Sequence, residues 1–390
     1  MKRVYLDNAA TTPIRNEVIR IMTNILKYSF GNPSSVQHSY GREARSIIEE
    51  SRIRIAKNIK ASPHEIIFTS GGTEANNLVL QSSILDFGVQ HILTSKLEHP
   101  SVLQTVLGLY KKYKVCINFI QIQKKGILDL NHMEDLLKKN YLKKTLVSLM
   151  YANNEIGNLL ELDQVIFLCK KYNAYFHSDT IQVIGNFPIH MDKLSLDFAT
   201  ASAHKFYGPK GVGFVFIRKH FLKKIKSFIS GGLQEYGIRS GTENTYGIAG
   251  LSEALQLSCC NYYKNIEKIR DLKLYCISEL KKIIPDIIFN GLSSDIDKSI
   301  PSILNILYPI KKKDHLFYFH LDLMGVSVSK GNSCYSNIPQ VSSVIQSITD
   351  ESLLKKRMPI RISFGIFNEK KDIDVLVTAL EKIKTKKNFS

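Results

Sequence analysis

The sequence lacks several features that would have fixed its class at once. None of its apolar runs approaches the roughly 18 residues that suggest a membrane span, and the polar pair Asp7-Asn8 follows the start too closely for a signal-peptide core. The chain also contains no internal repeat and no low-complexity linker. We therefore expect a globular protein that works in the cytoplasm, with no membrane partner.

The six cysteines include no C-x-x-C pair, so the sequence offers no zinc site or redox pair of that kind. Five of them lie in apolar or helical patterns and are interpreted as small buried hydrophobic residues. Cys334 differs, because it lies in the polar stretch Lys330-Gly-Asn-Ser-Cys-Tyr-Ser-Asn337, where a thiol could be exposed. From the residues alone, a structural and a chemical role for Cys334 remain equally open.

Acidic residues are few relative to basic ones. The chain has 35 Asp and Glu against 53 Lys and Arg, which gives a formal net charge of +18. Such an excess could attract a polyanion such as tRNA. The basic residues are scattered, however, and Lys, Ile and Asn are abundant throughout, as a compositional bias would produce. We favour this second interpretation and expect no direct nucleic-acid partner.

The length of 390 residues and a hydrophobic share of 44% suit one large domain plus a smaller one. Strand-like and helix-like stretches alternate between residues 66 and 177, which predicts a mostly parallel sheet with helices on both faces. One long helix is expected over residues 245–284, and a separate α+β unit after Pro285. The expected domains are residues 1–255, of which 1–15 could pack on the small domain, and residues 256–390, with Cys334 in a loop.

Polar residues follow several of the predicted strands. In open α/β sheets, ligands bind at the carboxyl ends of the strands. The loops that follow these ends can therefore bring residues from distant parts of the chain to one crevice. We expect four such residues to converge there: His99, Asn154, Asp179 and Lys205.

Three stretches carry recognisable chemistry. Lys205 follows a strand-like run, and partial desolvation there would make its amine nucleophilic enough for a Schiff base. Asp179 ends an apolar run, where an aspartate can hold a protonated pyridine nitrogen. Residues 68–74 combine a strand, a glycine turn and a helix start, which suits a phosphate. Each signal is weak alone, and together they favour a pyridoxal 5'-phosphate (PLP) site.

Motifs spread over nearly the whole chain resemble those of cysteine desulfurases of the NifS/IscS type. The resemblance places the chain in the class V aminotransferase-like group of fold-type I PLP enzymes. It implies an α/β PLP-dependent transferase whose large domain has a mostly parallel sheet, with a smaller α+β C-terminal domain. The motifs lie at residues 5–13, 30–35, 68–74, 98–99, 153–157, 204–205, 239–244 and 333–334.

The resemblance implies roles for individual residues. Lys205 would bind PLP covalently and move protons at the substrate Cα, Asp179 would pair with the pyridinium nitrogen, and Cys334 would take the sulfur. His99 would stack on the ring as an acid or base, and Arg361 would clamp the substrate carboxylate with a bidentate fork. Other cofactor contacts would come from Gly72, Thr73, Asn154, Gln182, Ser202, Ala203, His204 and Thr242, and Asn154 would also bind the substrate carboxylate.

The resemblance also implies partners. Thr242 matches a threonine that reaches the phosphate of the other subunit, which requires a homodimer. L-Cysteine would be the substrate and alanine the product. The sulfur held as a persulfide on Cys334 would pass to an acceptor protein for Fe–S cluster assembly, tRNA thiolation or both. No resident metal is implied, although Cys334 could transiently share an Fe–S cluster with a scaffold.

Two alternatives stay open. Another PLP lyase or transaminase of this fold, such as a selenocysteine lyase, would use the same residues, although Cys334 argues against most transaminases. A non-catalytic sulfur-relay scaffold is opposed by the presence of Lys205, Asp179, Arg361 and Cys334. Loop packing and acceptor docking are left open by departures from the family pattern at Leu233, Tyr236, Tyr335 and Ile366.

Overall fold

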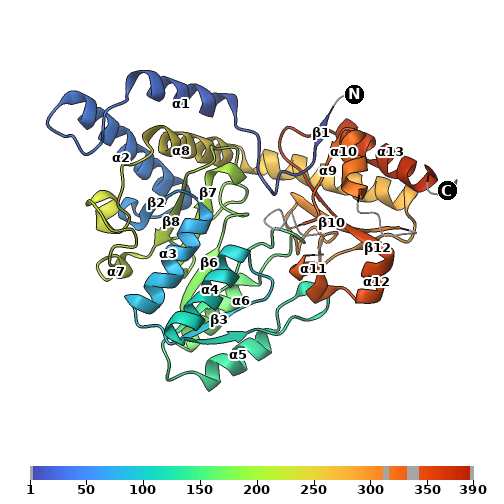
Figure 1. The fold of residues 1–390 in the computed structure, drawn as a ribbon, viewed down its shortest axis with the longest axis horizontal. Helices are drawn as coiled ribbons and strands as arrows, with labels where there is room; N and C mark the ends of the chain where they lie inside the picture. Colours follow the sequence, from blue (N-terminus) through green and yellow to red (C-terminus); the bar gives the residue numbers. More distant parts are fainter. Residues whose placement is uncertain (1–2, 311–315, 332–341, 387–390) are drawn as a thin grey trace.

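The computed structural model describes residues 3–310, 316–331 and 342–386. Figure 1 shows two regions side by side, one built around a large sheet and the other around a smaller one. The large sheet has seven strands in the order β2-β8-β7-β6-β5-β3-β4. These strands are β2 (Ile66–Thr69), β3 (His91–Thr94), β4 (Cys116–Phe119), β5 (Thr145–Ser148), β6 (Tyr175–Asp179), β7 (Phe198–Ser202) and β8 (Gly213–Ile217).

Most neighbouring strands of the large sheet run parallel, as the sequence predicts. β3 pairs in parallel with β4 and β5, and the parallel pairing continues from β5 through β6 to β7. β8 runs antiparallel to both of its neighbours, β2 and β7. The central strands are buried on both faces, which explains why they are short apolar runs rather than alternating ones.

Helices cover both faces of the large sheet. On one face, Leu78 and Val102 of two helices pack against Ile92 of β3. On the opposite face, Ile55 and Val165 belong to a second cluster of buried side chains. The first face carries α3 (Gly72–Leu85) and α4 (Pro100–Tyr113), and the second carries α2 (Ser39–Ile59), α5 (Leu130–Lys139), α6 (Leu162–Lys171) and α8 (Thr245–Cys260), with α1 (Asn16–Tyr28) beside α8.

The smaller sheet has its own core of buried side chains, which includes Leu272, Ile306, Ile362 and Leu376. It is antiparallel, in the order β12-β10-β9. Its strands are β9 (Ile288–Phe289), β10 (Ile303–Pro309) and β12 (Arg357–Ser363). The helices of this region are α9 (Tyr262–Ile283), α10 (Phe317–Leu323), α11 (Ser343–Ile348), α12 (Glu351–Lys356) and α13 (Lys370–Lys386).

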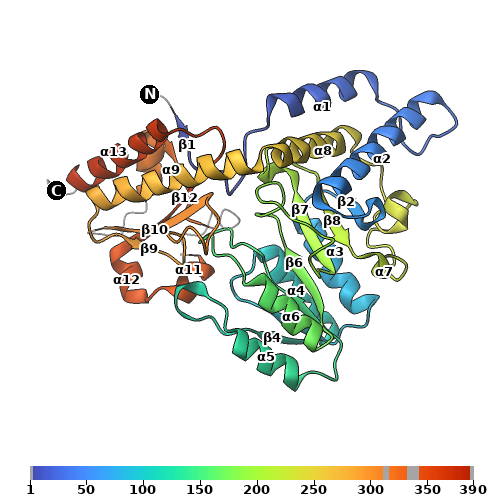
Figure 2. The same ribbon diagram turned by 180° about the vertical axis from the view of Figure 1, so that it is seen from behind.

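The expectation of one helix over residues 245–284 is wrong. α8 ends at Cys260 and α9 begins at Tyr262, with Asn261 between them at φ −122° and ψ 13°. The side-chain amide of Asn261 donates to the carbonyl of Leu257 at 2.8 Å. Asparagine competes in this way with helical hydrogen bonds, which explains the break. Figure 2 shows α8 and α9 running end to end, from the large-sheet region to the region of the smaller sheet.

The N-terminal segment joins the two regions. Strand β1 (Val4–Tyr5) pairs in parallel with β11 (Val326–Ser327), beside the smaller sheet. The chain then crosses to the large sheet, where the N–H of Thr12 donates to the carbonyl of His204 at 2.9 Å. The short elements that remain are α7 (Lys219–Leu222) and the 3-10 turns η1 (Pro63–Glu65), η2 (Lys124–Gly126), η3 (Ala203–Lys205) and η4 (Gln234–Gly237). In the part of the chain that the structure describes, no helix combines the length and apolarity needed to cross a bilayer.

Candidate active site

A cavity of about 220 Å³ lies where the carboxyl ends of the large-sheet strands meet the smaller sheet. Residues from seven separate segments of the chain line it, and most of these segments are loops that follow strands, as expected for ligand sites in open α/β sheets. The four strand-end residues predicted to converge do so. Of the predicted site residues, the lining includes Gly72, Thr73, His99, Asn154, Asp179, Gln182, Ser202, His204, Lys205 and Arg361.

Asp179 ends β6 and is buried, at 6% exposure. Its Oδ2 accepts a hydrogen bond from Nδ2 of Asn76 at 2.9 Å, and its Oδ1 accepts one from the backbone N–H of Ile181 at 3.1 Å. A carboxylate has about four acceptor positions. Two of them orient Asp179, and the others remain for a cationic N–H donor on the cavity side.

Asn76 holds the cavity residue Asp179 from behind and is a residue that the sequence analysis missed. It is fully buried in α3, and its Nδ2 also donates to Oγ of Ser101 at 2.9 Å. Its Oδ1 accepts from Oγ1 of Thr200 at 3.0 Å. The Oγ of Ser101 lies 2.8 Å from Nδ1 of His99. A buried chain of hydrogen bonds therefore links Asp179 to His99 through Asn76 and Ser101.

This chain fixes the tautomer of His99, which caps the N-terminus of α4. The backbone N–H of Ser101 donates to Nδ1 of His99 at 3.1 Å, so Nδ1 carries no proton and Nε2 does. Burial lowers the pKa of His99, with a further decrease from the Lys205 charge, while the Asp179 charge opposes both. His99 therefore presents a neutral imidazole whose Nε2–H is a donor.

Lys205 lies in η3, directly after β7. Its Nζ donates to the backbone carbonyls of Ala9 at 2.6 Å and Ala10 at 2.9 Å. The neighbouring His204 has its Nδ1 3.1 Å from Oγ1 of Thr11, and burial lowers its pKa to about 4. These contacts therefore join the N-terminal segment to the residues that follow β7. The amine of Lys205 lies where the two segments meet, on the wall of the cavity.

Ala203 lies differently from its neighbours. It is fully buried in the core, does not line the cavity, and its N–H donates to the carbonyl of Val212 at 3.1 Å. This backbone donor is therefore already used, although the resemblance implies a phosphate contact here. Ser202 and His204 on either side do line the cavity.

The turn between β2 and α3 forms the other end of the cavity. Gly71 has a φ of +152° and no side chain caps the helix that follows it. A Cβ at Gly72 would lie 2.1 Å from Cδ1 of Ile181, so a side chain at this position would have to displace the end of the Ile181 side chain. The first-turn N–H groups of α3 can therefore be approached closely by an anion. With a carboxylate opposite and a lysine between, the residues present fit PLP.

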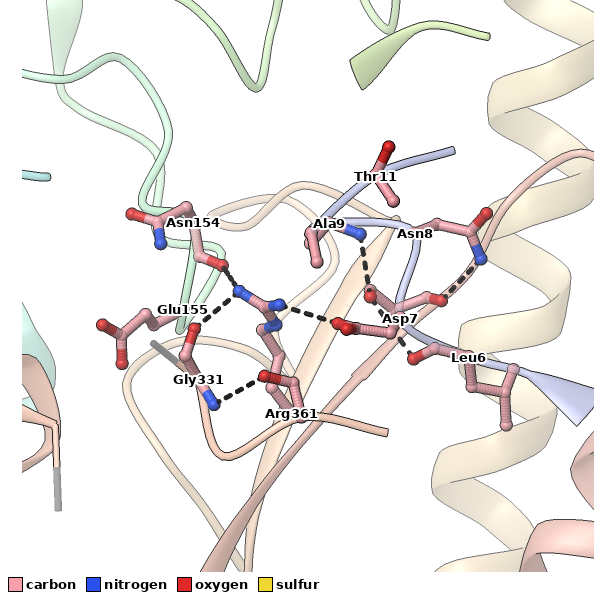
Figure 3. Close-up of polar contacts among 12 residues, drawn as sticks. Leu6, Asp7, Asn8, Ala9, Thr11, Asn154, Glu155, Gly331 and Arg361 are labelled. Carbon is pink, nitrogen blue, oxygen red and sulfur yellow. Dashed lines mark hydrogen bonds and ion pairs between the residues drawn. The ribbon is translucent and has the colours of Figure 1, made fainter. Parts of the chain in front are cut away.

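Arg361 forms the wall nearest the smaller sheet. The side chain projects from β12, and Arg361 is 1% exposed. Its Nη1 donates to the carbonyls of Asn154 at 2.8 Å and Gly331 at 2.7 Å, and its Nη2 pairs with Oδ1 of Asp7 at 2.7 Å (Figure 3). Its Nε–H is buried without a partner among the described residues.

Among the predicted site residues that the structure describes, Thr242, like Ala203, is not brought into the cavity. Thr242 is exposed and is not part of the lining. Cys334 lies outside the described residues, as does Tyr335. Of the other departures from the family pattern, Leu233 is 89% exposed, Tyr236 has a φ of +58°, and the N–H of Ile366 donates to the hydroxyl of Tyr207 at 2.9 Å.

The expectation that the other five cysteines are buried is wrong in part. Cys169 and Cys276 are buried, but Cys116 and Cys259 are only half-buried. Cys260 is exposed at the last residue of α8, where its Sγ lies 3.1 Å from Nε2 of Gln256. Two consecutive cysteines on a helix cannot both face the core, since neighbouring side chains point about 100° apart.

Three kinds of comparison relate this chain to known proteins. A family profile described as "Aminotransferase class-V" matches residues 4–376. The chain is 41% identical to "Cysteine desulfurase IscS" of Dictyoglomus turgidum, over 99% of this chain and 96% of the relative. It is 33% identical to "Cysteine desulfurase" of Rattus norvegicus, over 97% of this chain and 82% of the relative.

Solved structures agree with these sequence relatives. A structure titled "NIFS-LIKE PROTEIN" superposes with a TM-score of 0.87 at 31% identity, covering 98% of this chain and 99% of the other. A NifS-like protein from Rickettsia africae superposes with a TM-score of 0.85 at 33% identity, over the same shares of the two chains. The similarity thus extends over both regions of the fold.

Proposed function

The chain belongs to the aminotransferase class-V family and is a PLP-dependent cysteine desulfurase, and from this premise we propose how its residues divide the work. The observation that carries the proposal is the cavity on which Lys205, Asp179 and Arg361 converge. These three supply a nucleophilic amine, a carboxylate for a ring nitrogen, and a guanidinium for a substrate carboxylate. An aldehyde cofactor with a pyridine ring and an amino-acid substrate need these three groups together.

Each part of the cavity would hold one part of the cofactor. Lys205 would hold PLP covalently through Nζ, and Asp179 would accept from its ring nitrogen. The first turn of α3, with Thr73, Ser202 and His204, would bind its phosphate. Gln182 and Asn154 would contact its phenolic oxygen, and His99 would lie against its ring. When bound, PLP supplies an electron sink that stabilises negative charge on the substrate Cα.

The protein groups around the substrate would position it and move protons. Arg361 would bind the α-carboxylate of L-cysteine, assisted by Asn154. The amine of Lys205, once released, would take the proton from the substrate Cα and later return one. His99 would act through Nε2–H as a hydrogen-bond donor, because its Nδ1 already accepts from the N–H of Ser101.

We propose Cys334 as the sulfur acceptor. Its thiolate would attack the substrate sulfur, so that an S–S bond forms while the Cβ–S bond breaks and its electron pair returns to the carbon skeleton. Protonation of that carbon then gives alanine. Gly331, three residues earlier, is bonded to the cavity residue Arg361.

A second copy of the chain would complete the site. Thr242 is exposed outside the cavity, which suits a residue that serves a neighbouring subunit. Large apolar side chains are exposed on the loops and helix ends around it, and a hydrogen bond of 3.3 Å between Gln234 and Ser34 joins the loop of Leu233 to the loop that follows Phe30. Such a patch favours a protein interface. Its members include Leu26, Phe30, Tyr40, Leu233 and Tyr246.

We extend the proposal to the cellular role. The persulfide sulfur would pass to an acceptor protein for Fe–S cluster assembly, tRNA thiolation or both, in the cytoplasm. We also keep the division into a large domain of residues 1–255 and a small domain of residues 256–390. It is supported by the separate core around the smaller sheet, which includes Leu272, Ile306 and Leu376.

A single-turnover experiment tests the assignment of Cys334. Purified protein mixed with one equivalent of sulfur-labelled L-cysteine should retain the label on the Cys334 peptide and release an equal amount of alanine. Cys334→Ala should bind PLP and cysteine but carry no label. Cys260→Ala, which removes an exposed thiol elsewhere, is the matched control and should behave as the wild type. Undiminished release of alanine and sulfide by Cys334→Ala would refute the assignment.

A further inference from the structure

Residues 7–10 meet both charged groups of the site. The carbonyls of Ala9 and Ala10 accept from Nζ of Lys205, and the carboxylate of Asp7 pairs with Arg361. Figure 3 shows Asp7 and Ala9 on one stretch of chain beside the Arg361 guanidinium. A segment distant in sequence from both Lys205 and Arg361 therefore helps to define the cavity, and Asp7 is its one acidic residue.

The guanidinium of Arg361 makes specific demands because it is buried. It carries five N–H donors. Both donors on Nη1 are used by the carbonyls of Asn154 and Gly331, and one on Nη2 by Asp7. Among the described residues, Asp7 is its one partner within ion-pair distance. Carbonyls satisfy hydrogen bonds but carry no formal charge, so Asp7 is the anion in contact with the buried cation, while Glu155 interacts with it from beyond ion-pair distance.

Strand β12, which carries Arg361, also forms hydrogen bonds with the residues on both sides of Asp7. The N–H of Ser363 donates to the carbonyl of Leu6 at 2.7 Å, and the N–H of Asn8 donates back to the carbonyl of Ser363 at 3.3 Å. The N–H of Ala9 donates to Oγ of Ser363 at 2.9 Å. Ser363 lies two residues beyond Arg361, so β12 fixes the carboxylate and the guanidinium relative to each other.

Two donors of the guanidinium remain after these contacts. They are the Nε–H, which is buried without a partner among the described residues, and the second N–H of Nη2. They lie on adjacent nitrogens, the arrangement that binds a carboxylate through two parallel hydrogen bonds. Rotation of the guanidinium about its side chain would lose this fork, and the ion pair to Asp7 opposes such rotation.

Building on the proposed function, we propose that Asp7 is a positioning residue that holds Arg361 ready to bind the substrate's α-carboxylate. Asp7 does not touch the substrate. It fixes the plane of the guanidinium and compensates its charge. The Nε–H and Nη2–H donors are therefore already oriented when the substrate's carboxylate arrives. Removing the negative charge of Asp7 should then weaken recognition of the carboxylate specifically, while groups that bind the rest of the substrate keep their contacts.

Paired ligands isolate this effect. We would measure the affinity of the PLP-loaded enzyme for L-alanine and L-alaninamide by calorimetry, because the two differ only in the carboxylate that Arg361 would bind. The ratio of the two dissociation constants reports carboxylate recognition without turnover. Wild type should favour L-alanine, and Asp7→Asn should reduce that preference by roughly 10- to 100-fold, the range expected when a binding group is misplaced by about 1 Å.

Two further variants separate positioning from loosening of the segment. Asn8→Ala removes hydrogen bonds from Asn8 Nδ2 to Ser363 and Asn368 but leaves Asp7 and Arg361 in place, so the preference should stay as in wild type. Asp7→Glu keeps the charge one methylene further out and should restore part of the preference. Thermal unfolding of each protein without PLP checks that it is folded.

The outcomes distinguish a role of Asp7 in positioning Arg361 from a general role in holding the segment in place. An unchanged or increased preference for L-alanine in folded Asp7→Asn would overturn the proposal, as would an equal loss in Asn8→Ala. If Asp7→Asn does not fold, an unchanged preference in Asp7→Glu would overturn it. Wild-type desulfurase activity is measured first: its absence would count against the proposed function, whereas active wild type with an indifferent Asp7→Asn would count against Asp7 alone.

Discussion

The two sides of the cavity are built in different ways. The aspartate side, defined by Asp179, Asn76, Ser101 and His99, is joined by side-chain hydrogen bonds, and all four residues belong to the large-sheet region. The arginine side consists of Arg361 with Asp7, Asn154 and Gly331. Two of its three acceptors are backbone carbonyls, and its partners lie between 30 and 354 residues from Arg361 along the chain.

This contrast separates two tasks. The aspartate side would hold a resident cofactor, and its side chains are fixed by helices and strands of one core. The arginine side would bind a substrate that arrives and leaves, and it forms only where the N-terminal segment, the large-sheet loop after β5 and the strand β12 meet. Substitutions on the aspartate side should therefore change the chemical step, and those on the arginine side should change substrate binding.

The largest effect is expected from Asp179→Asn. The amide keeps the size of the side chain but removes the negative charge that would face the cofactor's ring nitrogen. We expect kcat for alanine formation to fall on the order of 10³-fold, the effect of losing a key electrostatic contact. Asp197→Asn is the matched control, because Asp197 is half-buried, accepts from the N–H of Phe176 and does not line the cavity. Equal losses in both variants would contradict the prediction.

A smaller effect, confined to binding, is expected from Arg361→Lys. Lysine keeps the charge but cannot make the fork or the contacts to Asp7, Asn154 and Gly331 together. KM for L-cysteine should rise roughly 10- to 100-fold, with kcat changed far less. Arg357→Lys, on the same strand but paired with Asp286, should leave KM unchanged. A fall in kcat without a rise in KM would erase the distinction between the two sides.

Asn76→Ala should affect the aspartate side more mildly. The variant leaves Asp179 and Thr200 each without one partner, at a cost of about 1–3 kcal/mol in the free energy of unfolding for each unsatisfied buried group. We expect kcat to fall roughly tenfold, since Asp179 keeps its charge but loses one orienting donor. Denaturant unfolding measures the loss of stability, and steady-state kinetics measures the fall in kcat. KM for L-cysteine should stay unchanged and serves as the internal control.

The last prediction leaves catalysis aside and concerns acid stability of the strand that carries Asp179. Burial lowers the pKa of His177 on β6 to about 3, against about 6.5 in an unfolded chain. Between pH 6.5 and pH 3 the unfolded state binds a proton at His177 that the folded state does not. The stability that the neutral, buried His177 preserves is therefore lost as pH falls from about 6.5 to about 3. His177→Phe should flatten the pH dependence of unfolding in that window by up to about 1.4 kcal/mol per pH unit. An unchanged slope would contradict it.

Much of the aspartate side could be predicted because it follows local rules. Strand ends of a parallel sheet meet at one edge, so His99, Asp179 and Lys205, together with Asn154 of the arginine side, could be expected at one place from their positions alone. Asn76 could not, because a buried asparagine inside a helix looks like any polar residue on a helix face until its neighbours are known. Glu98-His99 was identified as a motif, but the tautomer of His99 depends on a cap that only coordinates show.

The arginine side was largely beyond prediction from the residues. The pairing of Asp7 with Arg361 depends on a parallel bridge between residues 7 and 363 and has no short-range signal in the sequence. The helix break at Asn261 was missed for the opposite reason, since the apolar pattern continues across it while one side chain redirects the backbone. Contacts between residues far apart in the sequence, and a single side chain that competes for backbone hydrogen bonds, are the two effects that sequence patterns do not reveal.

Trapping the cofactor on the protein gives the most direct test of the site. PLP-loaded enzyme treated with borohydride, digested and analysed by mass spectrometry should carry the pyridoxyl group on the peptide that contains Lys205, and Lys205→Ala should carry none. The pyridoxyl group on any other lysine, or retained by Lys205→Ala, would contradict the assignment of this cavity as the PLP site.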